Sequence, residues 1–467
     1  AEGTLSAVAD IRAGQTIDVR GTRYVDLQKD AILKADDNNA ATKTDAIKLW
    51  AGDTLYVRSD AFGGHEIYLH SDGNVEMKAK LDSGHLIDVR AGLGPTGIGS
   101  VITDIEADLS TKGSEIIIRA GSSGGSLVLS DAQIFTAGPL TLAAPKGQIT
   151  HGGGQIAANS LTATARDGIA ANLNVRSLTA EVTGAGGVTL DTIGDVVVNS
   201  IKTAGGSVAI NGTGDIEART IVTRPGRGSV TLKSINGDLN IGTVVSNGDF
   251  LADTKTGNLT QIAGTIIYAA KSTLNGKMGD RFTLDSDELW FVSDKPGNVA
   301  IDHPNNRLFT VHQAYVLDGN FTVNTRGDML VKDVRVRSNT GNHAVSLTAG
   351  GNLTFGLINA GDYAVTPDHA LADITWEALG LLQPPAYRRR VDVSLTAGGS
   401  ILEIGPADPS VDLIADHVTL SAGGAIGALE FAANNVTVAR SGPGGVNWTP
   451  MDDIELYSYQ AGDITID

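Results

Sequence analysis

The chain has no cysteine among its 467 residues, which excludes a disulfide framework, a thiolate metal site and a cysteine nucleophile. Aromatic residues make up only 5% of it. It also lacks any run of about 18 apolar residues, so we expect no helix that spans a bilayer. Positive charge is scarce, and the net charge of −18 argues against nucleic acid and anionic membranes as partners, because both would repel the chain.

Helical periodicity is almost absent, whereas short runs that alternate apolar and polar residues occur throughout. The runs are rich in Val, Ile, Leu and Thr and are bounded by Gly, Asp, Asn or Ser. Examples are DTLYVRS (53–59), HEIYLHS (65–71), HLIDVRA (85–91) and SEIIIRA (114–120). Such runs are typical of β-strands, so the sequence predicts an all-β chain.

A short repeating unit organises these runs. The glycine that opens each unit recurs in nearly regular steps, at Gly147, Gly168, Gly194, Gly214, Gly237 and Gly257. A propeller blade needs about 40 residues, whereas one coil of a β-helix fits the shorter period. We therefore predict a right-handed parallel β-helix (β-solenoid) of about 20–25 residues per coil and roughly 22 coils.

The regularity of the repeat predicts four regions. Residues 1–137 form less regular N-terminal coils, 138–275 regular coils, 276–344 irregular coils or a side loop, and 345–467 a C-terminal solenoid with a helical insertion. The third region concentrates aromatic residues, namely Phe282, Trp290, Phe291, Phe309, Tyr315 and Phe321. These rings either fill wider coils or line a ligand groove.

The helical insertion is the segment 366–390, TPDHALADITWEALGLLQPPAYRRR. Thr366 and Pro367 suit a helix start, and Pro384 with Pro385 stops it. The helix either packs on its own solenoid wall or contacts a second subunit, where arginines would pair with acidic groups. The candidate contact residues are Leu371, Ile374, Trp376, Leu379, Tyr387, Arg388, Arg389 and Arg390.

A Gly-Asp pair precedes a β-branched or aliphatic run at Asp195, Asp215 and Asp238, and Asn258 takes the same place once. These residues are either corner residues, because Asx side chains bond nearby backbone amides, or a weak column of cation ligands. The uncharged Asn258 in this place favours the interpretation as corner residues. Calcium is therefore the one cofactor that stays open, and the nine histidines show no zinc-site spacing.

Catalytic motifs match poorly. The segments IDHP (301–304) and TRPGR (223–227) stand in reverse order to the pattern of pectate lyases. A glycosidase needs two carboxylates about 5–10 Å apart. The nearest acidic clusters are Asp285, Asp287 and Glu288, and Asp452 with Asp453. We therefore expect no enzyme, with a polysaccharide lyase or depolymerase that uses Asp302 and Arg224 as the alternative.

Three segments of the chain are nearly identical, namely VSLTAGGNL (345–353), VSLTAGGSI (393–401) and VTLSAGGAI (418–426). GSVTL and GDLNI, within residues 228–241, are further units of the repeat. They resemble the filamentous-haemagglutinin-like large exoproteins of bacteria, most clearly over 140–265 and 345–430. That resemblance implies a secreted or cell-surface β-solenoid, a segment of a fibre or an adhesin that contacts glycans or a host surface. The Asn-Pro-Asn signatures of the secretion domain are missing, and HPNN (303–306) is the nearest text.

The two ends of the chain add a further expectation. The first residues lack the pattern of a signal peptide, and the last residues, AGDITID, resemble a strand of the repeat. We therefore expect either a chain whose leader has been removed or a piece of a longer protein, and the last residues favour the second. Solenoid ends without caps expose strand edges, so end-to-end assembly with other copies is the expected partnership.

Overall fold

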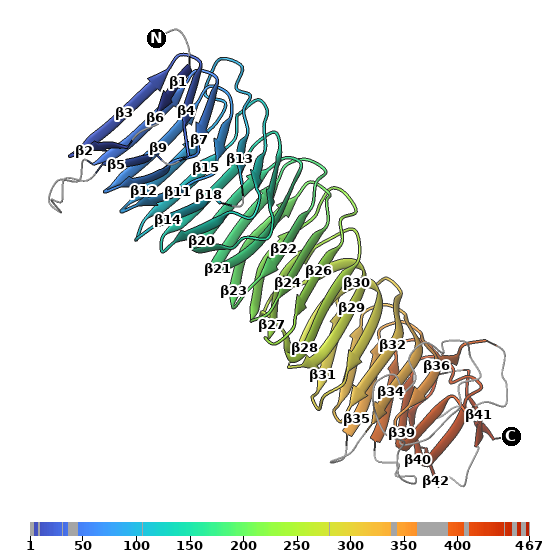
Figure 1. The fold of residues 1–467 in the computed structure, drawn as a ribbon. Helices are drawn as coiled ribbons and strands as arrows, with labels where there is room; N and C mark the ends of the chain where they lie inside the picture. Colours follow the sequence, from blue (N-terminus) through green and yellow to red (C-terminus); the bar gives the residue numbers. More distant parts are fainter. Residues whose placement is uncertain are drawn as a thin grey trace. The chain divides into compact units, whose positions relative to one another are not determined.

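The computed structural model describes residues 4–7, 10–29, 31–35, 45–104, 106–279, 281–337, 343–361, 391–405, 411–442, 444–450, 455–458 and 464–466. All regular structure in these ranges is β-strand, and every strand pair is parallel (Figure 1). The protein is a parallel β-solenoid of about 17 turns, as the repeat predicts. None of the described residues belongs to a helix long and apolar enough to cross a membrane.

The turns are fewer than predicted, because many turns are longer than the average repeat. Val75 pairs with Val101, and Val101 with Leu127, so each of these turns is longer than the turn from Val188 to Val208. Val345 pairs with Val393, which leaves a long interval between two successive strands of one ladder. The predicted helical insertion 366–390 falls inside this interval and lies outside the described residues.

The chain divides into two compact units. Unit 1 consists of Ala1–Gly237 and Val245–Gly248, and unit 2 of Asp238–Val244 and Asp249–Asp467.

Unit 1 begins with turns of three short strands, so that three ladders of parallel strands build the wall. The first ladder is β1 (Thr4–Ala7), β4 (Tyr24–Leu27), β7 (Thr54–Val57), β10 (Val75–Met77), β13 (Val101–Thr103), β16 (Leu127–Leu129) and β19 (Gln148–His151). The second is β2 (Ile11–Ala13), β5 (Ile32–Ala35), β8 (Asp60–Gly63), β11 (Lys80–Ser83), β14 (Asp108–Thr111) and β17 (Gln133–Thr136). The third is β3 (Thr16–Gly21), β6 (Ala46–Ala51), β9 (Glu66–Ser71), β12 (Leu86–Arg90), β15 (Glu115–Arg119) and β18 (Pro139–Ala144).

Later turns of unit 1 contain longer strands. β20 (Ile156–Ala165) pairs with both β17 and β18, so one strand continues two ladders. The others are β21 (Gly168–Val182), β22 (Val188–Thr192), β23 (Val196–Thr203), β24 (Val208–Gly212), β25 (Ile216–Val222) and β26 (Val230–Ser234). β27 (Leu239–Val245) has all but its last residue in unit 2.

The core of unit 1 consists of columns of aliphatic side chains, one from each turn. In-register pairing of the third ladder stacks Ile17, Ile47, Ile67, Ile87, Ile116 and Leu140, all buried. Alternation along each strand sends the next residue outward, which is why these strands read apolar-polar. Each fully buried side chain of this kind contributes about 1.5–3 kcal/mol to stability.

The remaining strands belong to unit 2. They are β28 (Phe250–Gln261), β29 (Ile267–Met278), β30 (Arg281–Ser293), β31 (Val299–His303), β32 (Phe309–Leu317), β33 (Phe321–Thr325), β34 (Met329–Arg337), β35 (His343–Ala349), β36 (Leu353–Asn359), β37 (Val391–Ala397), β38 (Ile401–Glu403), β39 (Leu413–Ala422), β40 (Glu430–Arg440), β41 (Val446–Pro450), β42 (Glu455–Ser458) and β43 (Ile464–Ile466).

The three near-identical segments of unit 2 stack directly on one another. Val345 pairs with Val393, and Val393 with Val418, so like residues form an interior column. Aromatic rings fill the turns before them. Phe291 and Phe321 are fully buried and stack with their centroids 6.2 Å apart, so these two rings fill the core. Trp290 is only half-buried and stacks on the His312 ring with a centroid distance of 4.0 Å.

Candidate functional site

The aspartates of the Gly-Asp pairs tie successive turns together. Asp195 Oδ1 accepts the backbone N–H of Asp215 at 2.9 Å, and Asp238 Oδ1 accepts that of Asn258 at 2.7 Å. A Cβ atom at Gly214 would lie only 2.5 Å from Asp195 Oδ1. Glycine therefore precedes aspartate because it leaves room for the carboxylate of the turn before.

Other corners repeat this hydrogen bond with uncharged side chains. In unit 1, Ser100 N–H donates to Asn74 Oδ1 at 2.9 Å, and Ser126 N–H donates to Ser100 Oγ at 3.1 Å. In unit 2, Ser400 N–H donates to Asn352 Oδ1 at 2.9 Å. Asp, Asn and Ser share an acceptor oxygen within reach of a nearby amide. Asp195 and Asp238 thus make the contacts of corner residues, and a cation column through Asp195, Asp215 and Asp238 stays a prediction.

A polar column on unit 1 lines an open groove of about 450 Å³. Asn172, Asp191 and Asn211 stand in register on three successive turns, and Asn211 Nδ2 donates to Asp191 Oδ1 at 3.0 Å. Ile193 and Ile235 also line the groove and are 53% and 48% exposed. The groove therefore combines amide and carboxylate groups with exposed apolar surface.

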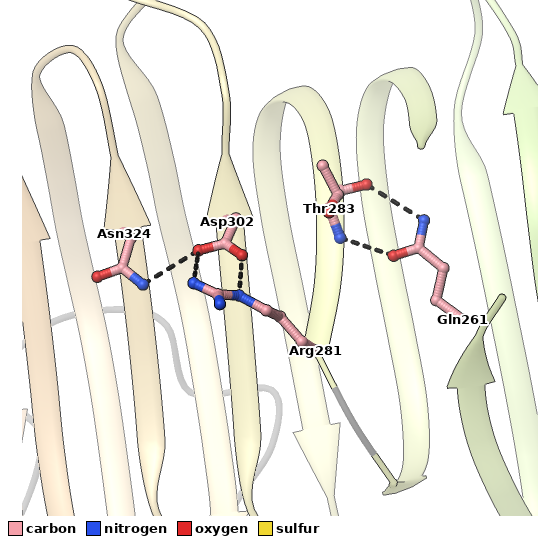
Figure 2. Close-up of polar contacts among 5 residues, drawn as sticks. All are labelled: Gln261, Arg281, Thr283, Asp302 and Asn324. Carbon is pink, nitrogen blue, oxygen red and sulfur yellow. Dashed lines mark hydrogen bonds and ion pairs between the residues drawn. The ribbon is translucent and has the colours of Figure 1, made fainter. Parts of the chain in front are cut away.

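The segment that matches the lyase pattern is held by neighbouring side chains in unit 2 (Figure 2). The Arg281 guanidinium forms an ion pair with both oxygens of Asp302, with Nη2 2.7 Å from Oδ1. Asn324 Nδ2 donates to the same Oδ1 at 3.1 Å. Arg224, the second predicted catalytic residue, belongs to unit 1. The carboxylate of Asp302 is thus bonded by side chains of neighbouring strands in unit 2.

His303 of the same segment points into the core. It is 1% exposed and stacks on Phe309 with a centroid distance of 4.8 Å. Burial lowers the pKa of His303, so the neutral ring is favoured. This position suits packing rather than proton transfer with a bound substrate.

Figure 2 also shows a side chain that replaces a stretch of backbone pairing. Gln261 Oε1 accepts the N–H of Thr283 at 2.6 Å, and Gln261 Nε2 donates to the carbonyl of Thr283 at 3.4 Å. A primary amide has the donor and acceptor of a peptide unit. Gln261 therefore continues the ladder where its own strand, β28, ends.

The acidic cluster in β30 is paired with basic groups. Arg307 bonds Asp285 and Asp287 together, with Nη1 2.6 Å from Asp287 Oδ1. Glu288 lies 3.5 Å from His312 Nε2. Arginine binds carboxylates in this way through charge-assisted hydrogen bonds. The other predicted acids, Asp452 and Asp453, lie outside the described residues.

The fold brings together a histidine pair that linear spacing does not reveal. One coordinating atom from each of His65, Glu66 and His85 lies within 4.8 Å of the other two, and the imidazole centroids are 4.6 Å apart. The hydroxyl of Tyr68 donates a hydrogen bond to Glu66 at 2.9 Å. Burial is the larger cause, and this hydrogen bond the second, that raises the pKa of Tyr68 to about 12. The histidines are one turn apart, a spacing that short zinc motifs do not contain.

The predicted partner-contact residues are not among the described residues. They are Leu371, Ile374, Trp376, Leu379, Tyr387, Arg388, Arg389 and Arg390. Their role as a contact with a second subunit stays a prediction.

Stacked turns, aliphatic interior columns and side-chain bonds at the corners define the class of this protein as a parallel β-solenoid. No protein-family model, curated protein or solved structure matches the chain. The resemblance to filamentous-haemagglutinin-like exoproteins therefore stays an expectation from the repeat segments.

Proposed function

We propose that this protein is a structural β-solenoid of the extracellular space or bacterial cell surface, a segment of a fibre or adhesin rather than an enzyme. One observation carries the proposal: hydrogen bonds and interior columns pass from turn to turn through each unit. Asp195 bonds the next turn at one corner, and Ile47 stacks between Ile17 and Ile67 inside. Such an arrangement transmits tension along the stacking direction and needs no convergent site.

The candidate catalytic acids are held in ion pairs, which agrees with this proposal. Asp302 is paired with Arg281, and Asp287 with Arg307. A general acid or base needs a carboxyl group that can reach the substrate. The arginines instead hold the carboxylate oxygens of both aspartates.

Electron microscopy of the purified chain tests the assembly part of the proposal. End-to-end stacking predicts fibres whose length increases with protein concentration, because each added copy pairs through parallel strand edges. Separate particles of uniform length at every concentration would refute assembly. Labelling of intact producing cells with an antibody to the chain would test display on the surface, and signal only after lysis would refute it.

The groove of unit 1 supports a second candidate function, glycan binding without turnover. The specific observation is the column Asn172, Asp191 and Asn211, which offers one polar group per turn about 4.8 Å apart. An extended glycan presents hydroxyl groups to such a column and its apolar ring faces to Ile193 and Ile235.

A glycan array followed by calorimetry tests this second function. We expect Asn211→Ala and Ile193→Ser to weaken binding at least tenfold, whereas Asn199→Ala, on another strand of unit 1, leaves it unchanged. Equal losses in all three variants would contradict a site in the groove. Release of unsaturated products or reducing ends from the bound glycan would instead favour the enzyme alternative.

A further inference from the structure

Three acidic side chains of unit 2 meet where three strands begin or end. Glu403 is the last residue of β38, Asp412 directly precedes β39, and Glu430 is the first residue of β40. One carboxylate oxygen from each lies within 4.8 Å of the other two. Glu403 and Asp412 lie on one turn, because β36 pairs with both β38 and β39. The stacking of the next turn places Glu430 beside Asp412.

Two of these side chains are buried. Asp412 is 6% and Glu430 4% exposed, and Oε2 of Glu430 has no hydrogen-bond partner. A buried polar oxygen without a hydrogen-bond partner is costly. The unpartnered Oε2 of Glu430 therefore points to a ligand held between the three acids.

Backbone hydrogen bonds hold the site in place. The N–H of Asp412 donates to the carbonyl of Glu430 at 3.1 Å, and the N–H of Glu430 donates to Asp412 Oδ2 at 3.2 Å. The carbonyl of Asp412 also accepts the N–H of Ile358 from β36 at 2.8 Å. The ligand atoms thus lie on paired strands, whose positions are set before any ligand arrives.

The three acids meet in a poorly solvated place. Carboxylates of like charge within 4.8 Å of one another repel strongly there. A divalent cation between the acids would replace this repulsion with attraction.

We propose that Glu403, Asp412 and Glu430 form a calcium site that joins β38, β39 and β40. All three donors are carboxylate oxygens, the ligands of hard cations. Calcium accepts irregular sets of oxygen ligands at about 2.3–2.6 Å, whereas magnesium requires a nearly ideal octahedron and gives up its water reluctantly. Glu403 is only half-buried, which leaves room for water as further ligands.

The site differs from the calcium column considered from the sequence. Asp195 and its equivalents accept backbone amides at the corners, whereas Glu430 Oε2 has no such donor. Calcium bound at the three acids would stabilise the last turns of unit 2 by mass action, because the unfolded chain does not gather these ligands.

Calorimetry and thermal melting of the full chain test the proposal after treatment with a chelator. Calcium chloride should raise the melting temperature of the wild type and bind with one equivalent per chain, and magnesium chloride at equal concentration should shift it less. Glu430→Gln should lose the calcium response, and Glu403→Gln should weaken calcium binding at least tenfold. The matched control Asp195→Asn should keep the wild-type response.

A second readout separates loss of a ligand from loss of folding. Without calcium, Glu430→Gln should melt no lower than the wild type, because the substitution removes a repelling buried charge. No response of the wild type to millimolar calcium, an equal response to magnesium, or an unchanged calcium response in both glutamine variants would overturn the proposal. None of these results bears on fibre formation, which is tested separately.

Discussion

Truncation of Phe321 to alanine tests whether the aromatic residues of unit 2 fill the solenoid. Phe321 is fully buried, is paired with Val299 and Val345 in the adjacent turns, and stacks on Phe291. A buried Phe→Ala change costs about 3–5 kcal/mol through lost transfer free energy and the cavity left behind. Loss of a ring stack adds to this about 0.5–1.5 kcal/mol, so we expect a value at the upper end.

The matched control is Phe135→Ala in unit 1, where the same ring is 38% exposed. There the expected cost is below about 1 kcal/mol. Urea denaturation measures the change in the free energy of unfolding of the whole chain. Because repeat arrays can unfold in parts, hydrogen exchange of peptides covering 309–349 measures the change in local stability. Equal losses for Phe321→Ala and Phe135→Ala would refute core filling and revive the ligand-groove interpretation.

Three further predictions concern side chains that bond the backbone. Asp195→Ala should destabilise the chain by about 0.5–1.5 kcal/mol, because it removes the hydrogen bond to the N–H of Asp215 at an exposed corner, whereas Asp195→Asn should keep most of the stability; equal melting of both variants would contradict the corner role. Gln261→Ala should accelerate hydrogen exchange at Thr283, whose N–H it accepts, by at least tenfold, and unchanged exchange would count against it. Burial lowers the pKa of His151, so below pH about 6.5 the unfolded chain binds the proton first and stability falls. The melting temperature should therefore drop more between pH 7.5 and 5.5 for the wild type than for His151→Gln, and parallel curves would disprove this.

The sequence predicts the strands well because their signal is local. Alternation in HEIYLHS places Ile67 and Leu69 inside, and both are buried in β9. The stacking of VSLTAGG segments likewise follows from near-identity, since like residues then form one column. The prediction of turn number was less accurate because loop residues enlarge some turns without changing the strand pattern.

Sites formed between turns were the part that local reasoning missed. His65 and His85 are one turn apart, and Glu403, Asp412 and Glu430 span two short intervals of unequal length. Motif spacings refer to neighbours on a helix or a hairpin, whereas here the two histidines, and likewise Asp412 and Glu430, are separated by one turn of the solenoid. Asp302 belongs to a weak motif match, and only the structure shows that Arg281 and Asn324 are bonded to it.

Alternation and turn-forming residues are enough to predict that the chain is all-β, that it repeats, and which residues of each strand face the core, because these are local properties. The lengths of the turns follow instead from the stacking in three dimensions, which makes the turn from Ser160 to Ser177 short and the turn from Val75 to Val101 long. Parallel pairing joins residues far apart in the chain, so the register of each strand depends on the strands of the turns before it. That register brings Glu430 next to Asp412 and makes a candidate site out of residues that look ordinary alone.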